Sequence, residues 1–213
     1  MADRTILVVN PNASVVMTDA IAASLPSDVR TGSQLRFMTN AAGPLAIESD
    51  ADVIAAARQV FAIAAQEPNH AIVIACFSDP GVVSVRATGR PLVFGIAESA
   101  YRAAVTAHGG FGVISIVGAS IARHARHVES LRLTAHLHGD RSLDLGVAGA
   151  SDESGLARII AIGRLLRDVD KAPAIILGCA GMGRHRSRVE AELGIPVLDP
   201  VLEGVRAARA ALG

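Results

Sequence analysis

The stretch AIVIACFSDPG, residues 71–81, decides the fold class of this chain. It begins with a run of small and β-branched apolar residues, which is typical of a strand buried on both faces. A cysteine, two polar residues, proline and glycine follow, and they indicate a sharp turn between a strand and a helix. The stretch AIILGCAGMG, residues 174–183, repeats the strand and its cysteine 103 positions later. The chain therefore contains two strand–cysteine–loop segments of the same kind.

Similar apolar runs alternate with longer alanine-rich stretches along the chain. Hydrophobic residues make up 51% of the sequence and aromatic residues 3%, which suits parallel strands covered by alanine-rich helices. This alternation predicts an α/β fold with mainly parallel sheet and helices on both faces. The predicted strands are residues 5–9, 35–39, 71–75, 92–94, 112–116, 131–136, 174–177 and 197–198. The predicted helices are residues 15–25, 49–66, 81–87, 98–107, 121–130, 154–168, 182–193 and 200–212, and residues 139–153 are expected to be a loose connection.

The two halves of the chain also resemble each other outside the cysteine segments. RPLVFGIAESAYRAA at residues 90–104 aligns with IPVLDPVLEGVRAAR at residues 195–209, with a proline and a glutamate at matching positions. A repeat of half the chain length predicts one unit built from two similar, intertwined α/β subdomains related by a pseudo-two-fold axis. The repeat halves are approximately residues 1–107 and 108–213. Each half has its cysteine at the carboxyl end of a strand, where ligands bind in open α/β sheets.

Charge and composition narrow the functional classes. Lys plus Arg and Asp plus Glu number 20 each, so the chain has no electrostatic footprint for nucleic acid. No run reaches the roughly 18 to 20 apolar residues of a membrane span, and the N-terminus has the pattern of a strand rather than a signal peptide. The absence of GxGxxG and GxxxxGK[ST] motifs gives no sign of a nucleotide cofactor. We expect a cytoplasmic protein, in which two cysteines are more often thiols than a disulfide.

Cys76 and Cys179 carry the clearest chemistry. Each follows a strand, and Ser78 or Asp79 could cap a helix that has a proline in its first turn. Backbone N–H groups and the helix dipole would then favour the thiolate of Cys76, and the nearby Arg184 would favour that of Cys179. The alternative is that both cysteines pack as small buried hydrophobes. Their equivalent positions in the repeat favour a chemical role.

Two thiols on opposite faces of one carbon can invert its configuration. A thiolate removes a proton from one face, a thiol delivers a proton to the other face, and the roles exchange with the handedness of the substrate. With each sulfur roughly 3 to 3.5 Å from the carbon, the two sulfurs would lie roughly 7 Å apart. Such a pair titrates as one unit. The sequence therefore favours racemisation of a small substrate without a cofactor.

Several polar residues could serve either the backbone or a substrate pocket. Asn10 and Asn12 flank a proline after the first strand, and they could hold a turn by Asx hydrogen bonds. Alternatively, Asn10 and Ser14 could face the cleft and bind polar substrate atoms. Ser78 and Ser115 could cap helices or donate to an enolate-like oxygen. The residues alone leave these alternatives open.

The loop GPLAIE at residues 43–48 precedes a predicted helix. It can be a plain turn, since glycine and proline favour turns. It can also place Pro44 and Ile47 in the lining of a cleft. Both possibilities stay open at the level of the sequence.

The seven histidines do not form a recognisable metal site. His124 and His127 are three residues apart on a predicted helix, and no carboxylate or cysteine completes the pair at a ligand spacing. The same holds for His136 and His138, which share a face of a predicted strand. We predict solvated surface histidines and no metal. GRHRSR at residues 183–188 is predicted to be a solvated helix face, or else a site for a substrate carboxylate.

The two cysteine segments and four further segments along the chain resemble the aspartate/glutamate/hydantoin racemase superfamily, and most closely its hydantoin and allantoin racemase branch. The resemblance implies two Rossmann-like subdomains with the active site between them, and cofactor-independent catalysis by Cys76 and Cys179. It further implies 5-monosubstituted hydantoins as substrates and a homo-oligomer. The matching segments span nearly the whole chain: ILVVNPNAS from Ile6, GPLAIES from Gly43, ACFSDPG from Ala75, VFGIAESA from Val93, LGCAGM from Leu177 and GIPVLDPV from Gly194.

One segment departs from the family pattern. After the fifth strand the family commonly has two threonines and then an arginine, whereas this chain has Ser115 and Ile116, with Ala119 at the arginine position. This departure affects the substrate more than the chemistry, so allantoin, aspartate or glutamate stay alternatives, as does a non-catalytic small-ligand-binding α/β protein. The substrate-binding residues implied by the resemblance are Asn10, Ser14, Pro44, Ile47, Phe77, Ser78, Ser115, Ile116, Ala180 and Gly181.

Overall fold

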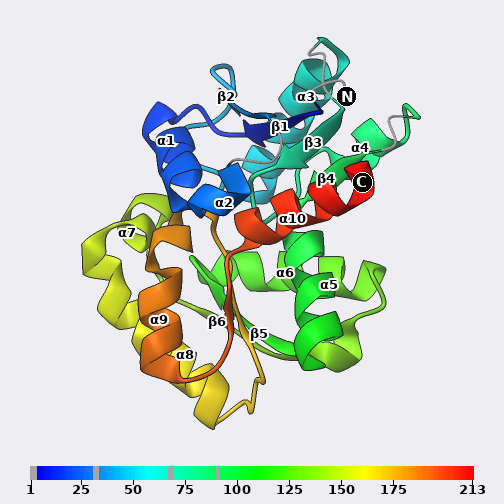
Figure 1. Cartoon of the computed structure of the whole chain (residues 1–213). Coiled ribbons are helices and arrows are strands. Elements are labelled where there is room, and N and C mark those ends of the chain that lie inside the picture. Colours follow the sequence, from blue (N-terminus) through cyan, green and yellow to red (C-terminus); the bar gives the residue numbers. More distant parts are fainter. Residues whose placement is uncertain (1–3, 31–33, 67–69, 90–91) are drawn as a thin grey trace. The chain divides into compact units, whose positions relative to one another are not determined.

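The computed structural model divides the chain into two units. Unit 1 consists of residues 1–99 and 201–213, and unit 2 of residues 100–200. In Figure 1, unit 1 runs from blue through cyan to the first green shades and includes the red helix α10, and unit 2 runs from green to orange. The structure describes residues 4–30, 34–66, 70–89 and 92–213, so the first two residues of the repeat segment 90–104 lie outside the described residues.

Unit 1 contains a four-stranded parallel sheet in the order β2-β1-β3-β4. Both ends of the chain belong to this unit, where the Arg4 guanidinium donates to the Gly213 carbonyl at 2.7 Å (Figure 1). The strands are β1 (Thr5–Asn10), β2 (Gln34–Thr39), β3 (Ala71–Ile74) and β4 (Val93–Gly95). The helices are α1 (Val15–Ser24), α2 (Ser27–Arg30), α3 (Asp50–Gln66), α4 (Val82–Arg86), the first turn of α5 (Ile96–His108) and nearly all of α10 (Pro200–Leu212).

Helices cover both faces of this sheet because successive residues of a strand point to opposite sides. Ile72 and Ile74 of β3 pack with Val60 of α3 on one face. On the other face, Gly204 of α10 lies so close to Val73 that an added Cβ would be 3.0 Å from its Cγ1. Strands buried on both faces become continuous apolar runs, which is why AIVI predicts β3 so well.

Unit 2 contains a second parallel sheet with the same arrangement, in the order β6-β5-β7-β8. The two sheets confirm the predicted α/β fold with parallel strands. The strands are β5 (Phe111–Ser115), β6 (Leu137–Ser142), β7 (Ile175–Leu177) and β8 (Val197–Leu198). Besides the rest of α5, the helices are α6 (Gly118–Ser130), η1 (Thr134–His136), α7 (Val147–Ser151), η2 (Glu153–Gly155), α8 (Leu156–Asp168), η3 (Ala180–His185) and α9 (Arg186–Leu193).

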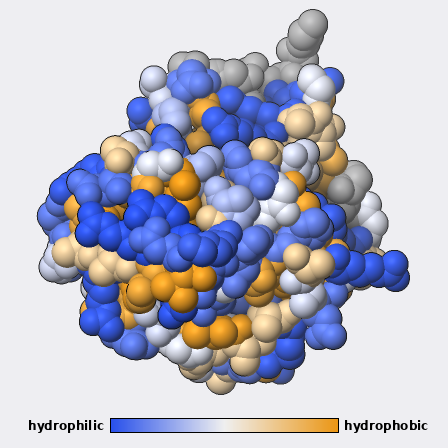
Figure 2. Space-filling model, turned by 90° about the horizontal axis from the view of Figure 1, so that it is seen from below, coloured by the Kyte–Doolittle hydropathy of each residue, from blue (hydrophilic) through white to orange (hydrophobic). Residues whose placement is uncertain are grey.

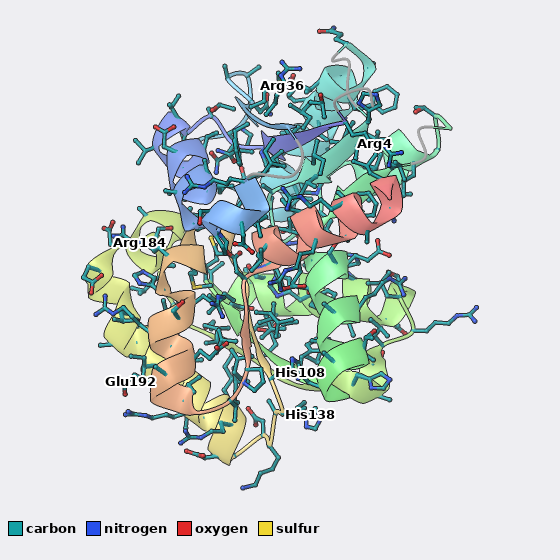
Figure 3. The ribbon with its side chains drawn as sticks, viewed as in Figure 1. Arg4, Arg36, His108, His138, Arg184 and Glu192 are labelled. Atoms are coloured by element: carbon teal, nitrogen blue, oxygen red, sulfur yellow. The ribbon has the colours of Figure 1, made fainter. Side chains whose placement is uncertain are left out.

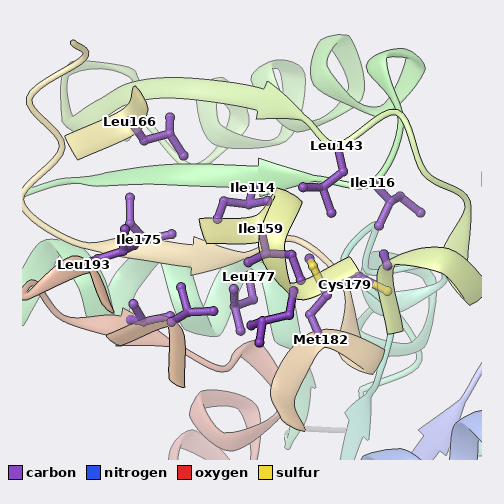
Figure 4. Packing of buried hydrophobic residues seen from close by; sticks show 14 of the residues in the cluster. Ile114, Ile116, Leu143, Ile159, Leu166, Ile175, Leu177, Cys179, Met182 and Leu193 are labelled. Carbon is purple, nitrogen blue, oxygen red and sulfur yellow. The ribbon is translucent and has the colours of Figure 1, made fainter. Parts of the chain in front are cut away.

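The core of unit 2 lies between its sheet and the helices α8 and α9. Ile114 and Leu177 of the sheet meet Ile159 of α8 and Leu193 of α9 in one buried cluster (Figure 4). Cys179 belongs to the same cluster at the carboxyl end of β7. The opposite face carries Phe111, whose ring stacks on Tyr101 of α5 with a centroid distance of 5.0 Å.

The predicted strand at residues 131–136 is wrong. These residues leave α6 through a turn, with Arg132 at a φ of +61°, and then form η1. The half-buried Leu131 and Leu133 imitate the alternation of a strand although they close the end of a helix. The true strand, β6, is the polar edge strand LHGDRS, which lacks the apolar run of a central strand.

Two further predictions fail for related reasons. The supposed loose connection at residues 139–153 contains most of β6 and the helix α7. The predicted helix 182–193 is divided into η3 and α9, with two glycines inside the tighter first part. Short elements with few apolar residues give a weak periodic signal.

No helix in the described part of the chain is long and apolar enough to cross a membrane. The face seen in Figure 2 carries hydrophobic residues in patches that hydrophilic residues interrupt. This face therefore offers no continuous apolar surface.

Substitution of Gly178 by alanine is expected to reduce the free energy of unfolding by about 1–3 kcal/mol. The added Cβ would lie 2.5 Å from the carbonyl oxygen of Ile114, a backbone atom that the strand ladder holds in place. Gly118→Ala is the control, because the nearest atom to its Cβ would be 3.8 Å away. Urea denaturation followed by circular dichroism measures both variants, and equal midpoints would contradict this account of β7.

Candidate active site

Cys76 stands at the carboxyl end of the sheet in unit 1. The Ala75 N–H donates to the Val9 carbonyl at 2.8 Å, so the ladder with β1 extends to the residue before the cysteine. The Asp79 N–H then donates to the Cys76 carbonyl at 2.9 Å and closes a turn. Asp79 adopts a φ of +45°, and the cysteine side chain is half-buried. The loop thus presents the thiol at the edge of the sheet where ligands bind.

Cys179 has the equivalent place in unit 2. The Gly178 N–H donates to the Ile114 carbonyl at 2.8 Å, and the Met182 N–H donates to the Cys179 carbonyl at 3.1 Å. Cys179 is 8% exposed and packs with Met182 and Ile116 (Figure 4). The two cysteine loops therefore share one backbone hydrogen-bond pattern. Within the described residues both cysteines are thiols that are not joined in a disulfide.

The cap predicted for the helix after Cys76 is wrong. The N-cap of α4 is Gly81, which has no side chain to cap with, and neither Ser78 nor Asp79 fills that role. Instead, Asp79 Oδ1 accepts a hydrogen bond from the Ala97 N–H at 3.0 Å, and Oδ2 accepts one from the Glu98 N–H at 2.9 Å. The carboxylate therefore caps the start of α5, a helix 18 residues further along the chain.

Burial raises the pKa of the Asp79 carboxyl from its usual value of 3.8 to about 7. The N–H donors of Glu98 and Ala97 oppose this shift, because they favour the charged carboxylate. The negative charge of Glu98 raises the pKa and the positive charge of Arg86 lowers it, while these two form an ion pair at 2.8 Å. Near neutral pH this carboxyl therefore changes its charge.

Ionisation of Asp79 gives a testable pH dependence of stability. Because its folded-state pKa is raised, its stabilising contribution is full below pH 3.8 and is lost as the pH rises through about 7. We expect Asp79→Asn to remove this fall from the curve of unfolding free energy against pH. Urea denaturation between pH 4.5 and pH 8 measures it, and parallel curves for the two proteins would contradict the raised pKa.

Asn10 is committed to the turn that follows β1. Its amide nitrogen lies within 3.0 Å of Asn12 Oδ1, the Ser14 carbonyl and Thr18 Oγ1, and its Oδ1 accepts from the Asn12 N–H at 3.1 Å. The side chain is 1% exposed. The Asx-turn alternative is confirmed, and the amide has both its hydrogens engaged without a substrate.

The loop after β2 is bound to the turn after β1. The Ala13 N–H donates to the Pro44 carbonyl at 2.9 Å, and Asn40 Nδ2 donates to the Pro11 carbonyl at 2.9 Å. Gly43 allows this approach, since an added Cβ would lie 2.5 Å from Pro11 O. Asn40 is not among the predicted site residues, although an asparagine directly after a strand and before a Gly-Pro turn signals such a role.

The other predicted site residues divide between the two units. In unit 1, Phe77 and Ile47 are buried, whereas Ser14, Pro44 and Ser78 are partly exposed. In unit 2, the buried residues are Ser115, Ile116, Ala180 and Gly181. Unit 1 thus brings the Asn10, Pro44 and Cys76 loops to one edge, and unit 2 does so for the Ile116 and Cys179 loops. Their roles toward a substrate stay predictions.

Ser115 belongs to a buried polar cluster with His124 and Asp140. The Ser115 hydroxyl donates to Asp140 Oδ1 and lies 3.1 Å from His124 Nδ1. His124 Nδ1 lies 2.9 Å from Asp140 Oδ2, and both side chains are 4% exposed. The hydroxyl proton of Ser115 is therefore used inside the protein, which does not support its predicted role as a donor to the substrate.

The prediction that the histidines are solvated is wrong for His124 and His185, which are 3% and 1% exposed. His136 lies in η1, so it does not share a strand face with His138. His138 belongs to the amino end of β6, and Figure 3 shows it far from Arg184 within unit 2. Asp140 is not among the predicted site residues, because the segment that forms β6 has the pattern of a loop.

Removal of the imidazole of His124 is expected to destabilise the protein by about 3 kcal/mol, because Asp140 would keep its burial and lose a charge-assisted partner. Glu192→Ala serves as the control. Glu192 pairs with Arg164 at 3.2 Å, and both side chains are 53% exposed, so little change is expected. Thermal or urea unfolding of His124→Ala and Glu192→Ala makes the comparison. An unchanged His124→Ala midpoint would contradict the importance of the cluster.

The basic segment 183–188 is only partly a solvated face. Arg186 pairs with Glu190 at 3.1 Å, and Arg188 pairs with Glu153. His185 is buried, and within the described residues its Nε2 has no hydrogen-bond partner. Burial lowers the pKa of this imidazole, while its bond to the Ser151 backbone raises it. Across the described ranges, no three His, Cys, Asp or Glu side chains are grouped so as to hold a metal ion.

Each of the two parallel sheets has a cysteine loop of the same design after its third strand. The family model described as "Asp/Glu/Hydantoin racemase" matches residues 6–208. The chain belongs to this family and is an isomerase.

The relatives share most of their length with this chain. It is 33% identical to the hydantoin racemase of Paenarthrobacter aurescens over 95% of this chain and 89% of that protein. It is 32% identical to the hydantoin racemase of Pseudomonas sp. (strain NS671), over 94% of this chain and 83% of that protein. Among solved structures, the allantoin racemase from Klebsiella pneumoniae has a TM-score of 0.88 and 29% identity, covering 98% of this chain and 87% of that one.

More distant structures support the fold alone. A glutamate racemase isoform from Bacillus anthracis has a TM-score of 0.74 at 17% identity, covering 100% of this chain and 82% of that one. The fold is thus shared by racemases with different substrates, and the substrate has to be argued from the site.

Proposed function

We propose that this racemase inverts C5 of 5-monosubstituted hydantoins with Cys76 and Cys179 as its two acid–base groups. The observation that carries the proposal is the equivalence of the two cysteine loops. Each loop follows the third strand of its sheet, and each has the same two backbone hydrogen bonds around the cysteine. If the two cysteines were only small buried hydrophobes, their loops would have no reason to match in this way.

The chemistry is a proton transfer through each face of the ring. The C5 proton is acidic because it lies next to a carbonyl group. One thiolate takes this proton and becomes a thiol, and the electron pair of the C–H bond passes into the carbonyl as an enolate. The opposite thiol then gives its proton to C5 and becomes the thiolate. The ring carries the negative charge itself, so the step as proposed needs no cofactor.

One thiolate and one thiol must be present at the start of each turnover. An ordinary thiol has a pKa near 8.5, so only a few per cent of it is ionised at neutral pH. The loop of Cys179 continues into Arg184, an exposed residue of η3 that Figure 3 labels, and a positive charge near the thiol would favour its thiolate. Because the two sulfurs act on one substrate, their ionisation belongs to the pair.

Allantoin is the second candidate, favoured by the likeness to the allantoin racemase from Klebsiella pneumoniae. Allantoin is itself a hydantoin with a ureido group at C5, so both candidates use the same ring chemistry. They differ in the polarity of the 5-substituent. The buried Ile116, which packs in the cluster that contains Cys179, favours an apolar substituent.

During the reaction in D2O, the optical rotation of the substrate should fall as its deuterium content at C5 rises. A single enantiomer of 5-benzylhydantoin in D2O should lose its rotation while deuterium enters C5, as followed by polarimetry and proton NMR. Cys76→Ala and Cys179→Ala should each slow racemisation by about 10²- to 10⁴-fold, because each removes one acid–base group.

Controls separate the candidates. Reactions without enzyme give the spontaneous rate, which is subtracted, and Cys→Ser variants keep the size of the side chain. Parallel reactions with allantoin, aspartate and glutamate rank the substrates. Binding of a hydantoin by calorimetry without any deuterium uptake would indicate a ligand-binding protein. Cysteine variants as fast as the wild type would refute the two-thiol mechanism.

A further inference from the structure

The residue directly before α5 supplies no side-chain cap to this helix. β4 ends at Gly95 and α5 begins at Ile96, so no loop residue stands between strand and helix. The residue at the cap position is Gly95, which has no side chain to accept the first N–H groups of the helix. An added Cβ at Gly95 would lie 2.2 Å from the Asp79 carboxylate. Gly95 therefore leaves the space that this carboxylate occupies.

Asp79 supplies the missing cap from the cysteine loop. Its two oxygens accept the N–H groups of Ala97 and Glu98, and its own N–H donates to the carbonyl of Cys76. One residue thus connects the backbone of Cys76 to the first turn of α5. The side chain is the part of this connection that a substitution can remove.

The helix α10, which is equivalent to α5 in the repeat, begins with a different sequence. Asp199 stands directly before Pro200, the first residue of α10, in the Asp-Pro order typical of a helix start. The residue equivalent to Asp79 is Met182, which keeps the turn to Cys179 while its side chain is buried in the apolar core. The loop of Cys179 is therefore held by packing, whereas that of Cys76 is held by a carboxylate.

We propose that Asp79 is a positioning residue that sets the place of Cys76 through its hydrogen bonds to the first turn of α5. This inference rests on the two-cysteine mechanism proposed above. Misplacement of a reacting group by about 1 Å can slow a reaction about 100-fold. Loss of the carboxylate therefore impairs proton transfer at Cys76 and leaves Cys179 in place.

Two substitutions remove the carboxylate without straining the backbone. Glycine and asparagine both tolerate the positive φ of Asp79, whereas alanine does not. Asp79→Gly removes both acceptors, and Asp79→Asn keeps one of them. We expect racemisation to fall by about 10- to 100-fold in Asp79→Gly and by less in Asp79→Asn.

The decisive measurement is exchange of the C5 proton in D2O without inversion, for each enantiomer of 5-benzylhydantoin separately. With one working thiol, the enantiomer that this thiol deprotonates can still take up deuterium from the same face, whereas the other enantiomer cannot. Cys76→Ala and Cys179→Ala should thus give opposite one-sided patterns. Asp79→Gly should give the pattern of Cys76→Ala, and a general loss of structure would instead lower exchange of both enantiomers.

Asp52→Ala is the matched control. Asp52 Oδ2 accepts from the Ser49 N–H at 2.9 Å and the Glu48 N–H at 3.2 Å, so this carboxylate binds the residues before α3 to the first turn of that helix in unit 1. Its loss should lower the melting temperature and leave exchange of both enantiomers in balance. Melting curves of all variants check folding, and Asp79→Asn carries the test should Asp79→Gly not fold.

The outcomes separate the two proposals. One-sided patterns for the cysteine variants, with equal loss of both exchanges in Asp79→Gly and Asp79→Asn, would overturn the positioning role alone. Asp79 variants that racemise as fast as the wild type would also overturn the positioning role alone. Absence of one-sided patterns in the cysteine variants would overturn the two-cysteine mechanism and the positioning role with it.

Discussion

The position of each cysteine in the candidate site is set by the backbone hydrogen bond of the residue before it. In unit 1 it joins Ala75 to Val9, and in unit 2 it joins Gly178 to Ile114. Each bond extends a central parallel ladder by one residue, so the cysteine that follows is the first residue released from the sheet. The hydrogen bonds of a parallel ladder are evenly spaced, and β3 and β7 each pair with a strand on both sides. The positions of the thiols are therefore set by the buried strands β3 and β7.

The surroundings of the two loops differ although their ladders match. Gly178 can lie close to the Ile114 carbonyl because it has no side chain. The loop of Cys179 then packs in the apolar cluster around Met182. The loop of Cys76 instead depends on Asp79, a carboxyl that burial holds near the midpoint of its titration at neutral pH. Packing does not respond to pH, whereas a carboxylate does. The repeat therefore conserves the geometry of the backbone and leaves the means of support to vary.

Much of this arrangement can be predicted from the sequence, because strands buried on both faces produce continuous apolar runs. AIVI and AIIL place β3 and β7, and with them both cysteines, within a residue or two. The edge strand β6 escapes prediction, since the polar side chains of LHGDRS have no periodic signal. The cluster of Ser115, His124 and Asp140 escapes with it, because its members are brought together only by the pairing of β5 and β6.

The function of Asp79 shows a second limit. A local pattern of Ser-Asp-Pro-Gly predicts a cap for the next helix, yet α4 has only five residues and little need of one. The longer helix α5 starts directly from a strand and needs acceptors for its first N–H groups. Tertiary proximity therefore redirects the carboxylate to Ala97 and Glu98. Sequence spacing could not reveal this, although Gly95 at the end of β4 was a signal that something must fit there.

Matched loops suit a reaction whose two directions are equivalent. Interconversion of mirror-image substrates has an equilibrium constant of one, so each acid–base group must act as a base for one enantiomer and as an acid for the other. A strong preference of either cysteine for the thiolate would speed one proton abstraction and slow the return of that proton. The two proposed thiols stand on like ladders, while Asp79 supports one loop and Met182 packs beside the other. The half-chain repeat is thus a physical way to keep both directions of the proposed reaction open.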